Sequence, residues 1–539
     1  MNRPPGPHGS APPDPPGPAP HGPRRSAPPD PPGATQSRPA HPAPSPPPAL
    51  SSPPAPPDPP GSARRNAVRR GPADKPISPL RDRARRVVTE TGPPTVPIAL
   101  PRRQSGLTAE VERSVLDLVL RTGEALITTG APVADTTAAL LRLAAGFGVT
   151  TCIIDITFTS ITATIDRDDD PITKVRVINV RTADYSRLAD LFDLVQAAGK
   201  GEIGLADAHV RLDEIVAAPH PYRRWVVTFA LGGMAAGVAV LLNGAWLAAC
   251  LAAATTMIID RLLRWLRNEG LPYMFQQAIG AGFATIVALF LNWGREEFGW
   301  REDLVTPSLV VAAGIVVLLA GLSLVGAAED AISGYPLTAA ARSFEVAIYT
   351  IGIVIGVGFV LDIGQRIGVP LRVVDHSALS TPFIVQLVAG GVIAGSWGLA
   401  SYSRPRTVAV ATGVGVVSAG MYLIVNDVGL GPAGSSFAAA LVVGILAGGV
   451  AERLGAPALA ISVCGITPLL PGLLIYRSMF TMVESNDLLA GASMLFGAVG
   501  IGLALAAGVT LGEFVATPLR GEMDRWQRRV RRRARGSRT

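Results

Sequence analysis

The sequence predicts a polytopic α-helical membrane protein, with about ten transmembrane helices as 5+5 inverted repeats behind a small α+β cytosolic domain and a disordered Pro-rich N-terminal tail. Only 17% of its 539 residues are charged, and most of these lie before residue 224 or after residue 519. Long apolar runs rich in Gly, Ala, Val and Leu fill the stretch between, as is typical of helices in lipid. Short sequence segments in the first half of this apolar region have matches in its second half, and these matches predict an internal repeat.

Residues 1–105 form the low-complexity tail. The string A-P-P-D-P-P-G occurs three times, at Ala11–Gly17, Ala27–Gly33 and Ala55–Gly61. Such a segment buries too little apolar surface to offset its ordering entropy, so we expect an extended spacer, with an SH3-like ligand as the alternative. It has no apolar h-region of a signal peptide. The net charge of +7 comes largely from this tail and from Arg525–Arg538, so it predicts no nucleic-acid site.

Residues 106–222 are predicted to form the cytosolic α+β domain. Glu110 and Glu112 lie in the first turn of a periodic apolar segment, where the helix dipole favours acidic side chains. Four helices are predicted, over 107–129, 133–147, 186–197 and 205–217.

A β-hairpin is predicted between the second and third of these helices. Residues 154–158 alternate apolar and polar, and residues 174–180 form a β-branched run that we expect to be the partner strand. The polar turn Asp166–Pro171 joins them. Its acidic residues resemble a calcium loop, but an EF-hand needs Gly where Pro171 stands, so we interpret it as a solvated turn.

No cofactor or metal site is predicted. The three cysteines, Cys152, Cys250 and Cys464, lie in different segments without a CxxC pair, so they support neither a disulfide framework nor a zinc site.

The apolar runs predict two five-helix transmembrane repeats, 223–365 and 380–518, followed by a basic cytosolic tail at 519–539. The ten predicted spans are 225–242, 245–260, 275–292, 305–326, 343–361, 382–400, 406–425, 435–451, 457–476 and 488–515.

Arginine placement predicts the orientation of these spans. One set of ends and loops holds Arg223, Arg224, Arg261, Arg264, Arg267, Arg342, Arg404, Arg406, Arg453 and the basic tail. The opposite loops hold Arg295, Arg301, Arg366, Arg372 and Arg477. Basic residues near spans favour the cytoplasm, so both termini are expected to be cytoplasmic.

The repeat rests on two matches. The segment Gly314–Leu322 matches Gly465–Leu473, and Gly232, Gly233 and Gly237 match Gly390, Gly391 and Gly395. Because each half has an odd number of helices, the second copy must be inverted, an architecture recurrent in secondary transporters. The alternative is chance similarity between Gly- and Leu-rich spans.

The ninth span holds two helix breakers, Pro468 and Pro471, beside Thr467 and Gly472. Proline frees upstream carbonyl groups, and freed groups at membrane depth are tolerated inside protein or along a wet cavity. These four residues are therefore candidates for a substrate path, with a packing kink as the alternative.

Ionisable residues near span ends are the second candidate set. Asp330 follows the fourth span in the loop that leads to Arg342, and Glu345 lies just inside the fifth span. Charge within a span indicates function by default, so these residues are candidates for proton coupling or substrate gating. Asp260 and Glu513 also lie near span ends, where access to water makes a charge less costly.

The chain resembles the bacterial threonine/serine exporter family over about residues 110–515. The resemblance rests on the segment Leu116–Ala131, on the block from Leu318 through Asp330, Gly334, Arg342 and Glu345, and on Pro468–Gly472. Where the first half of that family tends to have a Leu-x-Pro-Gly block, this chain has Ala320 before Gly321, and this departure weighs against a matching broken helix in the first half. The resemblance also implies a multi-pass protein of the bacterial inner membrane.

The resemblance implies a secondary exporter of threonine and serine driven by the proton motive force, an antiporter with protons and a small-molecule substrate as partners in the lipid bilayer. Two-chain relatives linked to dicarboxylate export make a succinate-like substrate the alternative. A membrane-anchored hydrolase and a non-transporting scaffold or sensor are the other hypotheses, although no GxSxG, HExxH or P-loop motif occurs. The sequence is also compatible with a homo-oligomer.

Overall fold

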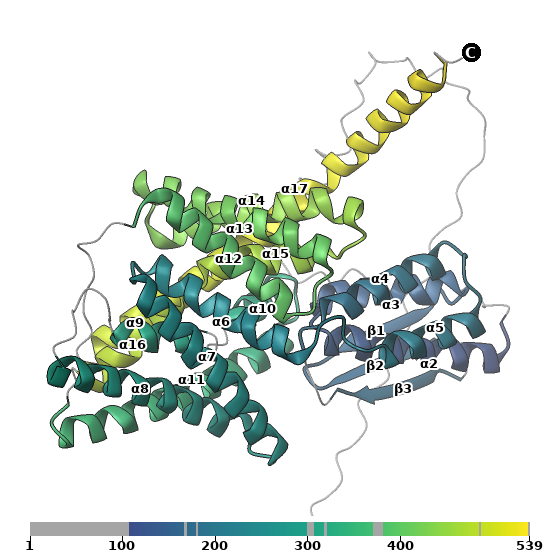
Figure 1. Ribbon diagram of the computed structural model, residues 1–539. Coiled ribbons are helices and arrows are strands. Elements are labelled where there is room, and N and C mark those ends of the chain that lie inside the picture. The colour runs from purple at the N-terminus through teal and green to yellow at the C-terminus, as the bar shows by residue number, and fades with distance from the viewer. Residues whose placement is uncertain are drawn as a thin grey trace, which may run out of the picture. The chain divides into compact units, whose positions relative to one another are not determined.

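The computed structural model (Figure 1) describes residues 107–166, 170–178, 182–298, 307–316, 318, 321–369, 381–484 and 487–536. The predicted N-terminal tail, residues 167–169 of the acidic turn, Ala320, Arg301 and Arg372 lie outside these ranges.

The N-terminal described part combines four helices with a three-stranded sheet. The helices are α2 (Ala109–Thr128), α3 (Val133–Gly146), α4 (Tyr185–Gly199) and α5 (Leu205–Ala217), and the strands are β1 (Cys152–Ile156), β2 (Ser160–Ile165) and β3 (Ile172–Val177). Each helix begins and ends within a few residues of its predicted range, because the apolar spacing that predicts it also faces the core.

The predicted hairpin was wrong in its pairing. The antiparallel sheet has the order β1-β2-β3, so Ile154 of β1 and Lys174 of β3 both lie opposite Ala163 of β2 and not opposite each other. The alternation of β2, with Ile161, Ala163 and Ile165 buried, is itself a strand pattern. Strand β2 begins at Ser160, four residues after β1 ends at Ile156, so in the sequence the two strands form one continuous polar-apolar alternation.

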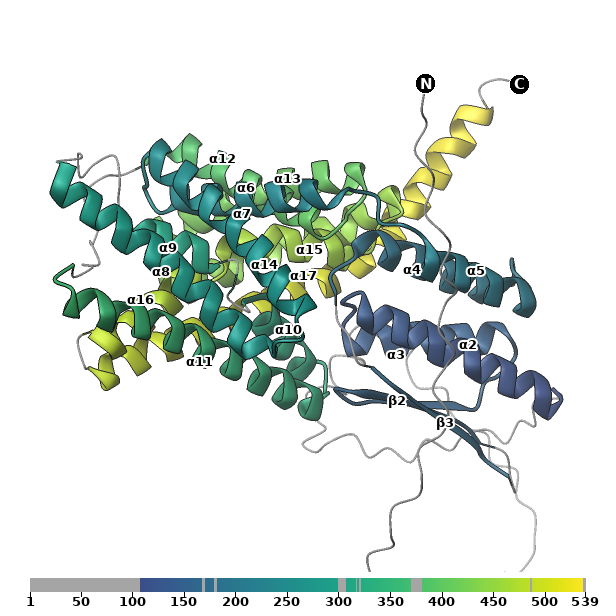
Figure 2. The ribbon, with the colours of Figure 1, turned by 60° about the horizontal axis from the view of Figure 1, so that its bottom comes forward.

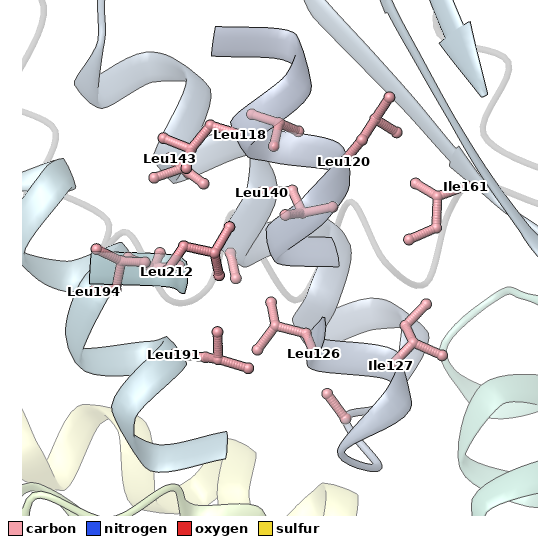
Figure 3. Packing of buried hydrophobic residues seen from close by; sticks show 14 of the residues in the cluster. Leu118, Leu120, Leu126, Ile127, Leu140, Leu143, Ile161, Leu191, Leu194 and Leu212 are labelled. Atoms are coloured by element: carbon pink, nitrogen blue, oxygen red, sulfur yellow. The ribbon is translucent and has the colours of Figure 1, made fainter. Parts of the chain in front are cut away.

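The helices cover one face of this sheet in two layers (Figure 2). Helices α2 and α3 contact the strands, and α4 and α5 pack on the other side of α2 and α3. Leucines from all four helices belong to the same apolar core as Ile161 of β2 (Figure 3). Gly123 permits this packing, since a Cβ there would lie 2.7 Å from Cδ1 of Leu140 and 2.9 Å from Cδ1 of Ile161. Leu140 and Ile161 are fully buried, so a side chain at position 123 would have to displace their methyl groups within a packed core.

The rest of the described chain is helical. Its elements are α6 (Arg224–Leu241), α7 (Trp246–Asn268), α8 (Tyr273–Phe298), α9 (Pro307–Val316), α10 (Gly321–Ile332), α11 (Pro336–Arg366), α12 (Phe383–Ala400), α13 (Pro405–Asp427), α14 (Gly431–Leu454), α15 (Ala458–Ile466), the 3₁₀ turn η1 (Thr467–Leu469), α16 (Gly472–Glu484) and α17 (Leu488–Gly536). Within the described ranges, eight of these helices are long and apolar enough to cross a membrane. The chain is therefore a polytopic helical membrane protein.

Two of the ten predicted spans are broken into shorter helices. The predicted ninth span is divided between α15 and α16 by η1, at the predicted prolines. The predicted fourth span is divided as well, because α9 ends at Val316 and α10 begins at Gly321. The departure at Ala320 lies outside the described residues, as do residues 317 and 319. Between α9 and α10 the described Leu318 forms a turn, in which its amide donates to the Ile315 carbonyl at 2.8 Å.

Small residues set the closest helix contacts, as expected from their spacing. A Cβ at Gly356 of α11 would lie 2.0 Å from the Ala278 carbonyl oxygen of α8, and one at Gly512 of α17 would lie 2.4 Å from the Leu441 carbonyl oxygen of α14. The basic segment after residue 519 continues α17 as helix to Gly536 (yellow in Figure 1).

Candidate functional site

The break between α15 and α16 lies on a cavity. Thr467–Leu469 forms one 3₁₀ turn, and the Gly472 amide then donates to the Leu470 carbonyl at 2.8 Å, so regular helix resumes only after Pro471. Neither proline has an amide hydrogen to donate, which is why the helical ladder stops here. Residues 468–471 line a cavity of about 430 Å³, a size typical of small-molecule sites.

The cavity wall is mostly apolar with a few polar groups. These come from separate helices: Gln386 of α12, Tyr422 of α13, Ser436 of α14 and Arg477 of α16. Among the described residues that line the cavity, Arg477 is the one cation and none carries a carboxylate. Such a wall favours a ligand with one negative group.

Arg477 was misplaced by the sequence analysis. We expected it in a loop after a ninth span ending at residue 476, whereas it lies in the second turn of α16, which runs to Glu484. The signal that could have found it is the break itself. If a helix starts again after Pro471, a span that ends at residue 476 would leave it only about five residues. The helix must therefore continue past residue 476 and include Arg477.

The Thr467 side chain is hydrogen-bonded to the backbone of the preceding helix turn. Its Oγ1 donates to the Val463 carbonyl at 2.8 Å, and the residue is buried. Of the four candidates at this break, Pro468 and Pro471 line the cavity, whereas Thr467 and Gly472 shape the chain beside it.

Asp330 and Arg342 form a buried ion pair. The Arg342 Nη1 lies 3.1 Å from Oδ2 of Asp330, whose side chain is 1% exposed. The Val133 amide at the start of α3 points to Oδ1 of the same carboxylate at 3.5 Å. The ion pair therefore joins α10 to α11 and also contacts the start of α3. Neither Asp330 nor Arg342 is among the described residues that line the cavity.

Glu345 does not join this pair. Its Oε1 accepts a hydrogen bond from the Tyr349 hydroxyl at 2.5 Å, one turn along α11. Tyr349 in turn packs on Tyr273 of α8, with ring centroids 4.5 Å apart. The structure thus separates Glu345 from the ion pair of Asp330 with Arg342, although all three residues lie near the ends of neighbouring predicted spans.

The two other charges near span ends are held by hydroxyl groups. Asp260 accepts from Thr228 Oγ1 at 2.7 Å and pairs with Arg264 on its own helix. Glu513 of α17 accepts from Ser462 Oγ of α15 at 3.0 Å.

The turn between α12 and α13 is bound by the N-terminal part. The Tyr185 amide at the start of α4 donates to the Ser401 carbonyl at 2.9 Å, and the Tyr222 hydroxyl donates to the Ser403 carbonyl at 3.0 Å. Tyr402 has a φ of +58°, a left-handed conformation uncommon for a non-glycine residue, and its ring stacks on that of His220 at 4.3 Å.

Arg404 adds charge to this contact. Its Nη2 donates to Asp190 Oδ1 at 2.7 Å and lies 3.7 Å from Asp193 Oδ2. Partial desolvation raises the pKa of the Asp193 carboxyl, and the guanidinium opposes that shift. The α12–α13 turn is therefore tied to α4 by both backbone and charged contacts.

Comparison with known proteins gives matches over both halves of the membrane part. A threonine/serine exporter family model matches residues 117–364, and a second one, "Threonine/Serine exporter, ThrE", matches residues 386–515. No solved structure matches the chain significantly.

Three curated proteins illustrate the likeness. A "probable threonine/serine exporter" of Mycobacterium tuberculosis is 40% identical over 435 residues, which are 78% of this chain and 79% of that one. The "threonine/serine exporter" of Corynebacterium glutamicum is 33% identical, over 75% of this chain and 83% of its own. A "probable succinate transporter subunit YjjP" of Escherichia coli K12 is 25% identical over 257 residues, 47% of this chain and 96% of its own.

Proposed function

The chain belongs to the threonine/serine exporter family and is a transporter rather than an enzyme, and we propose that it exports threonine and serine across the bacterial cytoplasmic membrane, driven by the proton motive force. The observation that carries the proposal is the cavity at the broken segment 467–471. A small zwitterion can be bound by one cation together with the carbonyl groups that a broken helix leaves exposed. The cation Arg477 and the interrupted segment 468–471 both belong to the cavity wall.

Alternating access through inverted repeats is part of this proposal. Corresponding helices make corresponding contacts: the third helix of each half packs on the fifth (α8 on α11, α14 on α17), and the first helices of the two halves, α6 and α12, pack on each other. Gly233 of α6 lies against Ser396 and Gly237 lies against Ile393, so these two run antiparallel. The opposite directions of two equivalent helices support inversion.

The breaks strengthen the correspondence. Each half has its discontinuous segment in fourth place, and Leu318 beside the first break belongs to the same apolar cluster as Ile475 beyond the second. In alternating access, two such halves exchange conformations around one site.

For orientation we propose a cytoplasmic N-terminal part and cytoplasmic termini. The α12–α13 turn with Arg404 and Arg406 lies on the side that this part contacts, in accordance with the preference of arginine for the cytoplasmic side. The cavity is lined by the opposite ends of α12 and α14, at Gln386 and Ser436, and would then open away from the cytoplasm.

Proton coupling is proposed for two carboxylates of the first half. Asp330 is buried beside Arg342, and its protonation would release the guanidinium for another partner. Glu345, bonded to Tyr349, is the second coupling candidate.

A dicarboxylate is the alternative substrate, supported by the name of the E. coli relative. A succinate-like ligand carries two negative groups, whereas the described part of the cavity wall offers one cation. Neutralising a second carboxylate would need a further positive group. The described part of the cavity wall thus fits a monocarboxylate better than a dicarboxylate.

Proteoliposomes loaded with radiolabelled threonine, serine or succinate test the function. We expect efflux of threonine and serine that depends on an imposed proton gradient and little efflux of succinate. Protein-free liposomes and a protonophore are the controls. Equal release of all three with and without protein would refute the proposal, and selective release of succinate would favour the alternative.

A further inference from the structure

Two polar residues from different helices line the cavity. Arg477 lies on α16, just beyond the break, and Ser436 lies on α14, near its beginning. Neither residue belongs to the proline block by which the family resemblance was recognised.

Ser436 has the features of a ligand-binding hydroxyl. Its side chain is 1% exposed, and its Oγ has no hydrogen-bond partner among the described residues. A buried hydroxyl without a partner is costly, unless a bound molecule or water satisfies it. The neighbouring Ser435 differs, because its Oγ donates to the Gly431 carbonyl at 2.8 Å. Ser435 therefore needs no ligand, although it is equally buried.

Arg477 supplies the matching charge. Its guanidinium belongs to a wall that is otherwise apolar or neutral where it is described, and charge is expressed more strongly in such surroundings than in water. The planar fork of a guanidinium binds a carboxylate through two parallel hydrogen bonds. A ligand bound here would thus place its carboxylate at α16.

We propose that Arg477 binds the carboxylate of the transported molecule and that Ser436 binds its side-chain hydroxyl, so that this cavity selects hydroxylated monocarboxylates. The proposal rests on the proposed function for the identity of the substrate, but it assigns the site by chemical class. Arg477 determines affinity for the acid group, and Ser436 determines preference for a hydroxyl over a methyl group.

Arg477 is tested by binding and efflux with matched ligands. Threoninol lacks the carboxylate of threonine, so wild-type protein should bind threonine at least about tenfold more tightly than threoninol. Arg477→Gln should abolish this difference, and Arg477→Lys should keep part of it. Arg366→Gln is the control, since Arg366 is 76% exposed and pairs with Asp362 on its own helix. Binding to purified protein is measured by scintillation proximity, after each variant is shown to be monodisperse.

Ser436 is tested with valine, which replaces the threonine hydroxyl by a methyl group. Wild-type protein should prefer threonine by about threefold or more. Ser436→Ala should remove that preference while leaving the threoninol comparison unchanged, and Ser435→Ala should leave both preferences intact.

The outcomes separate the two proposals. If wild-type protein exports threonine but Arg477→Gln binds it as tightly, the site assignment is refuted and the proposed function stands. If threonine is not exported but valine or butyrate binds in an Arg477-dependent way, the carboxylate site stands and the proposed function fails. If no carboxylate in the panel binds in that way, the assignment is wrong.

Discussion

Gly356 allows α11 to lie directly on α8, so Gly356→Ala is expected to push these helices apart. An added Cβ would lie 2.0 Å from the Ala278 carbonyl oxygen and 2.7 Å from its carbon. Both are backbone atoms, and no side-chain rotation relieves the clash. Reaching an ordinary contact of 3.4 Å requires a shift of 1.4 Å (3.4 − 2.0).

The energetic cost follows from comparison with a glycine in open space. Gly500 of α17 has no atom within 4 Å of an added Cβ. Both substitutions gain up to about 1 kcal/mol of helix propensity. Their difference therefore isolates the packing cost at Gly356, about 1–3 kcal/mol.

Thermal unfolding of the purified variants in nanodiscs measures this difference. Gly356→Ala should melt below wild-type protein and Gly500→Ala at or above it. Equal melting temperatures for both variants would refute the close contact of α11 with α8. Gly512→Ala, which meets the Leu441 carbonyl oxygen in the second half, should behave like Gly356→Ala if the two halves are equivalent.

Three further predictions follow from the described contacts. Arg342→Gln should destabilise the protein by about 3–5 kcal/mol in SDS-unfolding titrations, because Asp330 stays buried without its cation, and adding Asp330→Asn should recover part of the loss. Arg404→Ala should speed hydrogen exchange of the Tyr185 amide several-fold, because that amide is bonded across the contact that Arg404 supports. Burial raises the pKa of the Cys152 thiol to about 11, so maleimide should label it slowly at pH 7.5 and about tenfold faster per pH unit up to pH 10.

Each of these has an outcome that contradicts it. A double variant at Asp330 and Arg342 that is less stable than the single Arg342 variant would mean that the pair is not mutually stabilising. Unchanged exchange at Tyr185 in the Arg404 variant, with faster exchange elsewhere in α4, would place the effect outside this contact. Rapid labelling of Cys152 at pH 7.5, with Cys250 and Cys464 replaced by serine, would show an accessible thiolate.

The sequence predicted elements whose apolar period is long and uninterrupted. The helix over Ala109–Thr128 and eight continuous spans follow from spacing and length alone. Strand β2 was missed because short neighbouring strands share a polar-apolar alternation, and pairing depends on contacts that no local pattern encodes.

The site was predictable only in part. The prolines predicted an interrupted ninth span, and η1 does separate α15 from α16, whereas no proline near Val316 or Gly321 predicts that α9 and α10 are separate helices. Arg477 and Ser436 come from different helices, and tertiary packing places both of them on the wall of one cavity. The ion pair of Asp330 with Arg342 was not predicted, because the sequence shows that the two residues flank one short connection but does not show which charges meet.

The contacts between the N-terminal part and the α12–α13 turn bear on whether the two halves could exist as separate polypeptides. The N-terminal part continues directly into α6 and also holds Ser401 and Arg404 of the other half without any covalent link. Two polypeptides divided between Val369 and Thr381 would therefore keep this contact and the α6–α12 seam as means of reassembly. The described contacts between the halves therefore do not depend on the covalent connection, and fusion or fission of the gene at this point would need no new interface.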